Sequence, residues 1–444
     1  MTMRIFIFIG PTISETECRA HLDATYLPPV SQGDVASLLR FNPDVIGIVD
    51  GYFDQVPSVW HKEILLALSK GVRVVGAASM GALRAAELHP FGMEGVGKIF
   101  EWYRDGVIDA DDEVALRHAP AEFGYIPLSE ALVNIRATLD AACNDGAASE
   151  STRETLIRLA RAMPYWKRTF SSLLEAGLQA GLGAGALAKL RTYFAQNRID
   201  QKKADAIALL RHIAALDSKQ VAATDVRLEE TGYFKGLLDS DVRLGLPGDR
   251  SQPTLGELTD FARLWLPDFV DVMKNAGQGR MNRLLANRFG VQVSKRDVEE
   301  EETAFRARHK IETEDDLQAW LVRNAATQEE LMVHLEEAAL EAKVRKMFAV
   351  TNNRHTLWEL RESGRFESLL AAWQERDAAH PHVEAGAVSQ DELFALYKNL
   401  AGDAHSETFV EAALRLGFRN KNNMLAELLK IHQHRPDRTD QRGG

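Results

Sequence analysis

Four short apolar segments, each followed by a segment of helix-forming composition, constrain the fold of this chain more than any other feature. They cover residues 4–10, 24–27, 44–49 and 72–77, and they do not alternate apolar with polar side chains. Strands of this kind are typical of a parallel sheet that crossover helices bury on both faces. The sequence therefore predicts an α/β fold class with a flavodoxin- or Rossmann-like parallel-sheet domain at the N-terminus. A further strand is expected over 111–118.

The rest of the chain is predicted to be mostly α-helical, because apolar residues recur at helical spacing from about residue 150 onward. Pro and Gly residues at 245–253 make that segment the best candidate for a linker. Helices starting after Thr313, Thr327 and Ser389 share an acidic, capped start, either as a loose repeat or as independent helices. The expected parts are an α/β core over 1–145, a helical extension packing on that core over 146–244, a second all-helical domain over 254–431 and a disordered tail over 432–444.

Composition excludes several classes of partner. A net charge of −11 argues against nucleic acid, which needs clustered Lys and Arg. Cys18 and Cys143 are the two cysteines, so no disulfide framework is indicated and a reducing compartment is favoured. The apolar run at 5–9 is too short to span a membrane, and the histidines lack metal-ligand spacing. We expect a cytoplasmic protein without membrane, nucleic acid, cofactor or metal.

Loops that follow parallel strands meet at one edge of the sheet and line its ligand crevice. Four such loops are rich in Gly, Pro, Ser and Asp: Gly10 to Thr12, Pro28 to Asp34, Asp50 to Phe53 and Ala78 to Gly81. Their convergence is stronger evidence for a site than any single loop. The residues expected to contact substrate are Gly10, Pro11, Thr12, Gln32, Asp34, Gly51, Tyr52, Met80, Gly81 and Arg84.

Ser79 lies on the turn between the apolar run at 72–77 and a helix predicted over 81–88. A serine on a sharp strand-to-helix turn between small residues is typical of a nucleophile elbow. The spacing here is A-x-S-x-G, with Ala77 in place of the usual first glycine. The alternative is an ordinary strand–helix junction in which Ser79 is the N-cap.

Several segments together carry a family resemblance. They are the loops at 10–12 and 28–34, Pro43 to Phe53 (PDVIGIVDGYF), Trp60 to Leu65 (WHKEIL), Gly76 to Leu88 (GAASMGALRAAEL) and Pro127 to Arg136 (PLSEALVNIR). Through them residues 5–136 resemble the TfuA-like family, and a weaker similarity continues to about residue 240. The helices over 250–430 are not part of this resemblance and look faintly like the peptide-holding segments of SurA-type chaperones.

The resemblance implies an accessory enzyme of peptide backbone thioamidation in ribosomal peptide natural-product biosynthesis. The implied partners are a YcaO-type cyclodehydratase, which activates a backbone amide with ATP, a ubiquitin-like thiocarboxylated sulfur carrier protein and the precursor peptide. The implied reaction is hydrolysis of the carrier thiocarboxylate, which supplies sulfide to the YcaO partner.

Such a hydrolysis resembles acyl transfer, which needs a nucleophile, a base and an oxyanion stabiliser. Ser79 is the expected nucleophile. The amides of Met80 and Gly81, with those of Gly51 or Tyr52, are expected to bind the oxyanion.

Two histidines compete for the role of base. His61 lies on the helix after the Asp50 loop, and the order Asp50, His61, Ser79 occurs in hydrolase triads. His118 ends the strand predicted over 111–118, which would bring it to the same sheet edge if that strand is parallel. Asp50 either orients a histidine or caps the Asp-Gly turn.

Other assignments stay open at this point. Arg84 can form a helix ion pair with Glu87, and Gln32 and Asp34 can start a helix instead of contacting substrate. Two other functions compete with hydrolysis of the carrier. One is a non-catalytic docking protein that activates the YcaO partner, with Ser79 merely structural. The other is a serine peptidase or esterase that uses the same elbow.

Overall fold

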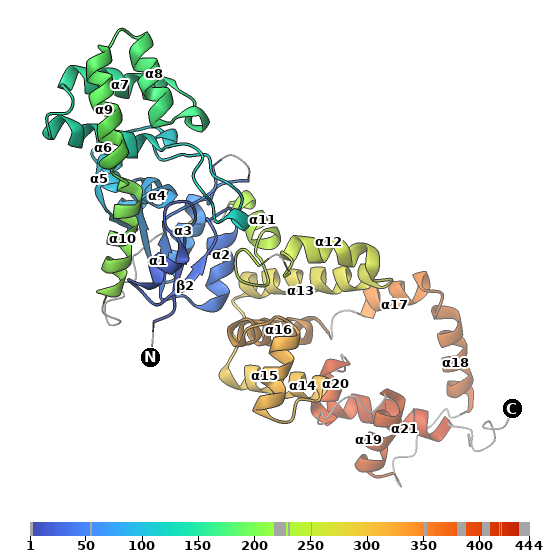
Figure 1. Cartoon of the computed structure of the whole chain (residues 1–444). Helices are drawn as coiled ribbons and strands as arrows, with labels where there is room; N and C mark the ends of the chain where they lie inside the picture. Colours follow the sequence, from blue (N-terminus) through green and yellow to red (C-terminus); the bar gives the residue numbers. More distant parts are fainter. Residues whose placement is uncertain are drawn as a thin grey trace. The chain divides into compact units, whose positions relative to one another are not determined.

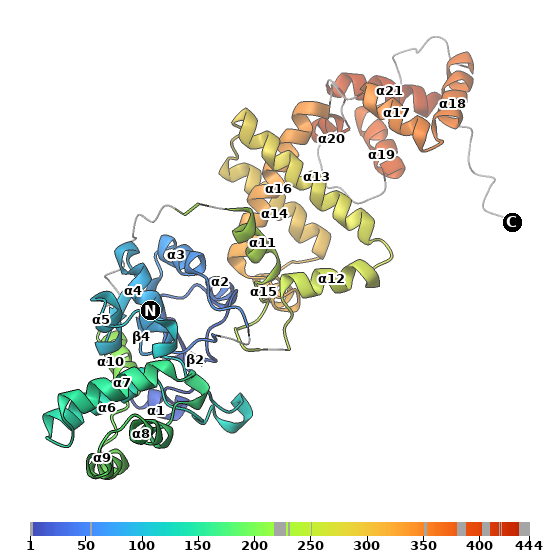
Figure 2. The same ribbon diagram turned by 90° about the horizontal axis from the view of Figure 1, so that it is seen from above.

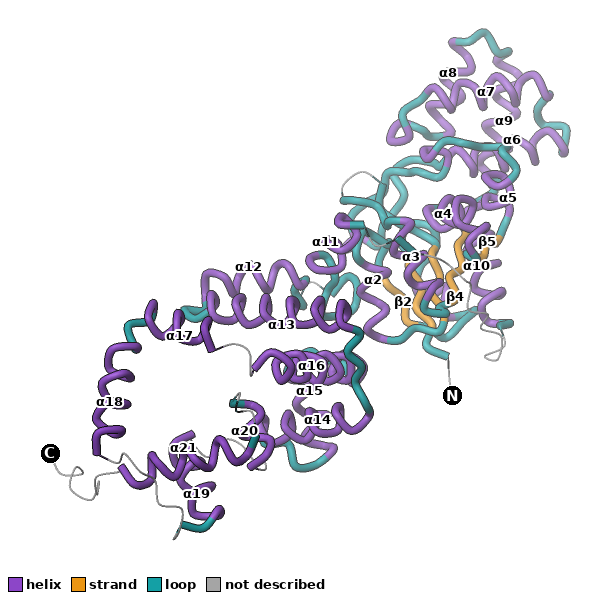
Figure 3. The backbone as a smooth tube through the Cα atoms, turned by 180° about the vertical axis from the view of Figure 1, so that it is seen from behind, coloured by secondary structure: helices purple, strands orange, loops and turns teal. Residues whose placement is uncertain are grey.

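The computed structural model (Figure 1) describes residues 3–53, 56–216, 228–229, 231–249, 251–349, 353–379, 388–401, 409–416, 418 and 420–434. The chain divides into two compact units, Met1–Trp265 and Leu266–Gly444. Strands occur in the first unit, whereas the described part of the second unit is helical (Figure 3). No helix in the described ranges is long and apolar enough to cross a membrane.

A five-stranded parallel sheet forms the centre of the first unit. Its strands are β1 (Ile5–Phe8), β2 (Thr25–Leu27), β3 (Val45–Ile48), β4 (Arg73–Ala77) and β5 (Glu94–Val96), in the order β2-β1-β3-β4-β5. The predicted α/β class and parallel sheet are confirmed. The strand order reverses direction between β1 and β3, and in sheets of this order ligands bind outside the carboxyl ends of those two strands.

Alternate residues of the strands serve two separate cores. Phe6 and Phe8 belong to one core, and Ile5 and Ile7 belong to the other. The first core is covered by α2 (Asp34–Leu38), α3 (His61–Ser69), α4 (Met80–Leu88) and α5 (Lys98–Arg104). The second core is covered by α1 (Glu15–Arg19) and α10 (Gln201–Ala214). Burial on both faces explains why the strands read as continuous apolar runs.

The fifth strand is β5, and the strand predicted over 111–118 is wrong. Residues Asp111–Glu113 instead form a 3-10 turn that leads into irregular chain. Side chains from elsewhere in the first unit bind three consecutive residues of this segment. If residues 111–118 formed a strand, the carboxylates and carbonyls of residues 112–114 would lose these side-chain donors.

Three cations bind the segment 112–114. Arg168 donates to the carboxylate and carbonyl of Asp112, and Arg136 donates to both carboxylate oxygens of Glu113 at 2.7 and 2.9 Å. The Lys202 ammonium donates to the carbonyl of Val114 at 3.0 Å. These cations come from just before α8, from α6 and from α10. The conformation of the segment is therefore set by long-range charge pairing.

Four helices form a bundle with its own core next to the sheet (Figure 2). They are α6 (Leu132–Asn144), α7 (Glu150–Ala162), α8 (Phe170–Gln179) and α9 (Ala184–Gln196). Ser149 caps α7 and Thr169 caps α8 through their hydroxyl groups, so local capping fixes where these helices start. The unit ends with α11 (Gly232–Ser240) and α12 (Leu255–Trp265), which pack on each other.

The segment proposed as a linker is hydrogen-bonded within the first unit. Leu244 donates to Pro253, and Arg243 and Thr254 form an antiparallel bridge. The division between the compact units falls at Trp265, after α12. The four-part division expected from the sequence stays a prediction.

The second unit contains α13 (Phe269–Phe289), α14 (Lys295–His309), α15 (Glu314–Arg323), α16 (Gln328–Ala349), α17 (Asn353–Glu362), α18 (Phe366–Ala379), α19 (Gln390–Ala401), α20 (Phe409–Arg415) and α21 (Lys421–His434). The hydroxyls of Thr313, Thr327 and Ser389 each accept the backbone amide of the acidic residue three positions later, as predicted. Within the expected tail, residues 432–434 belong to α21 and residues 435–444 lie outside the described residues.

Candidate functional site

Asp50 and Thr12 lie in the loops that follow β3 and β1, the two strands at which the sheet order reverses. The Thr12 hydroxyl donates to Asp50 Oδ1 at 2.6 Å, and the Thr12 amide donates to Oδ2 at 3.0 Å. Asp50 is 2% exposed, so these bonds replace the water that a buried carboxylate would otherwise need. The loops after β1 and β3 are thus joined through one buried charge.

The four predicted loops meet at this edge of the sheet. The amide of Val30 donates to the carbonyl of Asp50 at 3.0 Å, which joins the second loop to the third. A Cβ on Gly10 would lie 2.5 Å from Pro29, and one on Gly51 would lie 2.7 Å from Met80 Cγ. Both glycines therefore permit close approach between neighbouring loops. Pro11 lies in the turn between Gly10 and Thr12.

Ser79 follows a strained residue at the end of β4. Ala78 has φ +67°, which is unusual for a residue with a side chain, and Ser79 has φ −119° and ψ −120°. Ser79 holds the N-cap position of α4, but its hydroxyl makes no capping bond and has no hydrogen-bond partner among the described residues. The N-cap alternative therefore describes its position but not its bonding.

Two of the four amides expected at the oxyanion site are engaged. Gly81 donates to the carbonyl of Val49 at 3.3 Å, and Tyr52 donates to that of Val30 at 3.0 Å. The amides of Met80 and Gly51 have no acceptor within the described part of the chain. Met80 is the first residue of α4, where the helix dipole favours negative charge. These two amides are the ones available to an anion.

Lys202 is a residue of this site that the sequence analysis missed. Its side chain is 2% exposed, and its Nζ lies 3.8 Å from Asp50 Oδ1 as well as 3.0 Å from the Val114 carbonyl. Burial lowers the pKa of Lys202, while the charges of Asp50, Asp200 and Glu130 act in the opposite direction. A buried ionisable group beside a charged partner at a sheet edge is typical of functional sites.

Asn134 holds the start of α10 in place behind Lys202. Its Oδ1 accepts the Lys202 amide at 3.1 Å, and its Nδ2 donates to Glu130 at 2.9 Å and Asp200 at 3.1 Å. Burial raises the pKa of Glu130. Glu130 and Asn134 lie in the segment 127–136 that carried part of the family resemblance, so that segment supports the site from outside the sheet.

His61 does not form the expected triad. Its Nε2 lies 2.8 Å from Glu87 Oε2, and its side chain is 46% exposed. Glu87 is eight residues after Ser79 on α4, which corresponds to about 12 Å along the helix. Arg84 forms the ion pair with Glu87 at 2.7 Å and donates to the carbonyl of Val59. His61 and Arg84 therefore belong to a cluster on the side of α4, away from Asp50.

His118 lies in an irregular arm, residues 116–129, and not at the end of a sheet strand. It forms an antiparallel bridge with Pro127, and its ring contacts Tyr125 edge-on with 5.4 Å between centroids. Burial, a hydrogen bond with Tyr52 and the Asp50 charge raise the pKa of Tyr125. The arm thus reaches the site through Tyr125 and Tyr52, while His118 bonds the carbonyl of its neighbour Ala119.

Gln32 and Asp34 are engaged with neighbouring elements of the first unit. Gln32 Nε2 donates to Asp241 at 2.6 Å, just after α11. Asp34 accepts the amide and hydroxyl of Ser31 at 2.8 and 2.7 Å, and burial raises its pKa. Both side chains therefore fix the loop after β2, consistent with the helix-start alternative.

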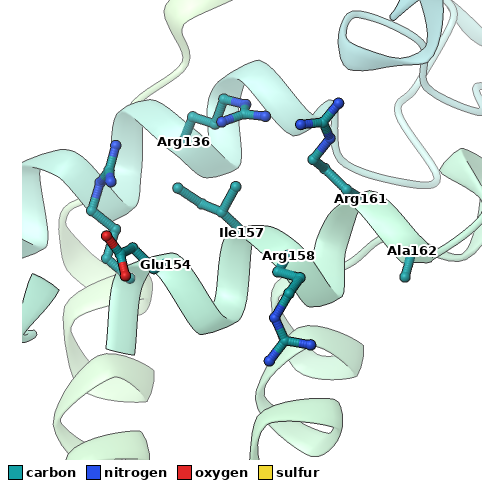
Figure 4. Close-up of a pocket in the computed structure, with 7 residues that line it drawn as sticks. Arg136, Glu154, Ile157, Arg158, Arg161 and Ala162 are labelled. Atoms are coloured by element: carbon teal, nitrogen blue, oxygen red, sulfur yellow. The ribbon is translucent and has the colours of Figure 1, made fainter. Parts of the chain in front are cut away.

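A hollow of about 580 Å³ lies on the helical bundle and not at the strand ends (Figure 4). Its lining residues are Arg136, Arg153, Glu154, Ile157, Arg158, Arg161 and Ala162. Three of its arginines already bind carboxylates: the pairs are Arg136–Glu113, Arg153–Asp140 and Arg161–Asp109. Because these charges are largely satisfied, we place no chemistry there. Among the described residues, no group of three His, Cys, Asp or Glu side chains is arranged to hold a metal ion.

The strand order and the position of Asp50, Thr12 and Ser79 define a doubly wound α/β domain with a polar site at its switch point. A family model described as TfuA-like protein matches residues 50–169, which confirms the resemblance to the TfuA-like family. This family is associated with YcaO-related thioamide biosynthesis. No curated protein matches the chain. The matched range includes Asp50 and Ser79 but neither Thr12 nor Lys202.

Proposed function

We propose that the chain hydrolyses a thiocarboxylated, ubiquitin-like sulfur carrier protein and supplies sulfide to a YcaO-type partner during backbone thioamidation of a precursor peptide. The family association supports the biosynthetic setting. The observation that carries the hydrolytic role is Ser79, which follows the strained Ala78 at the start of α4 and whose hydroxyl has no hydrogen-bond partner within the described part of the chain.

The proposed reaction converts a thiocarboxylate and water into a carboxylate and hydrogen sulfide. Ser79 Oγ forms a bond to the thiocarboxyl carbon while its proton passes to Asp50. The amides of Met80 and Gly51 stabilise the oxyanion. The C–S bond then breaks, and the leaving sulfur takes the proton from Asp50 and departs as hydrosulfide. Water next bonds to the acyl carbon as the bond from that carbon to Ser79 Oγ breaks. One water proton returns to Ser79 Oγ and the other goes to the hydrosulfide, which leaves a carboxylate and hydrogen sulfide.

Asp50 is assigned as the proton acceptor because of its place in the sheet. Ile48 at the end of β3 pairs with Gly76 of β4, and Asp50 and Ser79 follow the carboxyl ends of these two neighbouring strands. Backbones of neighbouring strands are about 4.8 Å apart. Both histidines considered from the sequence make their bonds elsewhere.

Release of sulfide from a purified thiocarboxylated carrier tests this function. We expect the Ser79→Ala variant to lose at least about 100-fold in rate, because it lacks the nucleophile. Ser69→Ala is the matched control, since Ser69 is an exposed serine at the end of α3 whose hydroxyl bonds Leu66. Equal rates for wild type and Ser79→Ala would remove Ser79 as nucleophile.

One observation favours a second candidate, a non-catalytic partner that activates the YcaO enzyme. Thr12, Asp50, Ser79 and Lys202 are all buried in the isolated chain. Under this alternative the wild type releases no sulfide, yet thioamidation by the partner is faster when the chain is added. Hydrolysis of neutral peptide esters with no thiocarboxylate activity would instead indicate a peptidase or esterase.

A further inference from the structure

Lys202 and Asp50 form a buried ion pair that joins two distant parts of the first unit. Asp50 follows β3, and Lys202 lies in the first turn of α10, which covers the opposite face of the sheet from α4. The Nζ–Oδ1 distance is 3.8 Å, and both side chains are 2% exposed. A buried charge without its partner is strongly disfavoured, so each group depends on the other.

The groups around the pair show that Lys202 is the cation of this cluster. Asp50 is faced by Thr12, and its charge contributes to raising the pKa of Cys18 on α1 and of Tyr125 in the arm, although burial is the largest cause in both. The charges of Asp200 and Glu130 also act on Lys202 and favour its charged form. The next residue, Lys203, is directed away and pairs with Glu17.

The backbone around Lys202 restricts the position of its ammonium group. Asn134 accepts the Lys202 amide, and the Val114 carbonyl accepts from Nζ. Lys202 is thereby held from both ends, with Nζ near Asp50 Oδ1, the oxygen that also accepts the Thr12 hydroxyl. Two donors and one cation keep the carboxylate in a single orientation.

We propose that Lys202 is a positioning residue that holds the Asp50 carboxylate beside a cation and in one orientation, so that Asp50 can accept the proton of Ser79. This inference rests on the proposed function for the role of Asp50. It makes α10 part of the site, although α10 lies outside the matched residues 50–169. The alternative is that Lys202 has only a structural role, in which its ammonium group binds the Val114 carbonyl.

The first test is the pH dependence of sulfide release by the full-length chain. Lys202→Met removes the cation that lies beside Asp50, so the acidic limb of the rate profile should move up by at least about one pH unit, a tenfold loss of rate at a fixed acidic pH. Lys203→Met is the matched control and should keep the wild-type profile. A Lys202→Met profile that is lower but unshifted would overturn the proposal.

The second test does not depend on hydrolysis. Unfolding equilibria of Lys202→Met, Asp50→Asn and the double variant form a cycle, in which labelling of Cys18 reports exposure of the second core. If the two effects were independent, the changes in the unfolding equilibrium constant would multiply. We expect the unfolding equilibrium constant of the double variant to be at least about tenfold smaller than that product. Additive effects would show that the two groups are not coupled and would overturn the proposal. If wild type releases no sulfide while coupling is present, the proposed function fails and the ion pair stands.

Discussion

Glu63 connects the starts of two helices through one buried carboxylate. Its Oε2 accepts the amide of Ala36 in α2 at 3.3 Å, and its Oε1 accepts the amide of Trp60 before α3 at 3.2 Å. The side chain is fully buried, and burial raises its pKa from 4.5 to about 7. Glu63 should therefore make the stability of the first unit depend on pH near neutrality.

Because the pKa of Glu63 is higher in the folded state than in the unfolded state, ionisation of this carboxyl destabilises the fold. Below pH 4.5 the Glu63 carboxyl is protonated in both the folded and the unfolded state, so its ionisation does not change the free energy of unfolding. As pH rises from 4.5 to about 7, the unfolded chain loses the proton first, so folding stability falls. The full penalty, about 3 kcal/mol for a shift of this size, is present above pH 7.

Glu63→Gln removes this penalty because glutamine does not ionise. We expect the stability of the variant relative to wild type to rise by about 3 kcal/mol between pH 4.5 and pH 8. At low pH the variant should be within about 1 kcal/mol of wild type, since the protonated carboxyl and the amide each keep one good acceptor oxygen.

Urea unfolding followed by pulse labelling of cysteine measures this effect. Both cysteines lie in the first unit, and Cys18 is buried, so labelling reports that unit and not the helices after Trp265. Glu15→Gln, which changes an exposed pair with Arg19, is the control. A stability difference between Glu63→Gln and wild type that is the same at pH 5 and pH 8 would refute the reasoning.

Two further predictions concern the loops around the site. Gly51→Ala should destabilise the first unit by about 2 kcal/mol in the same unfolding assay, because its Cβ would lie 2.7 Å from Met80 Cγ, whereas Gly183→Ala, with nothing within 4 Å, should be near neutral. His61→Gln should leave sulfide release within about twofold of wild type, because its ring bonds Glu87; a loss as large as that of Ser79→Ala would return His61 to the site.

The first four strands could be predicted because burial on both faces leaves a direct mark on the sequence. β5 could not, since Glu94-Gly95-Val96 has no apolar run and is a strand only by pairing with β4. The segment after Asp111 resembles a strand locally, but cations from other elements determine its path. Propensity carries no information on such partners.

The site residues that follow strands could be predicted from the sequence. The residues whose position depends on tertiary packing could not. Asp50, Thr12 and Ser79 follow strands, so the topology alone places them at one edge. His61 starts α3 next to the site loop, but its side chain lies against the far part of α4. Lys202 had no signal in sequence, because an amphipathic helix gives no indication that one of its lysines lies beneath the sheet edge.

The three cations that bind residues 112–114 have a consequence for how the first unit opens. Arg136, Arg168 and Lys202 belong to the bundle and to α10, so separating the bundle from the sheet would leave buried charges without partners. Partial opening at this boundary is therefore costly. The bundle, α10 and the sheet should exchange their amide hydrogens as one cooperative unit, despite having separate apolar cores.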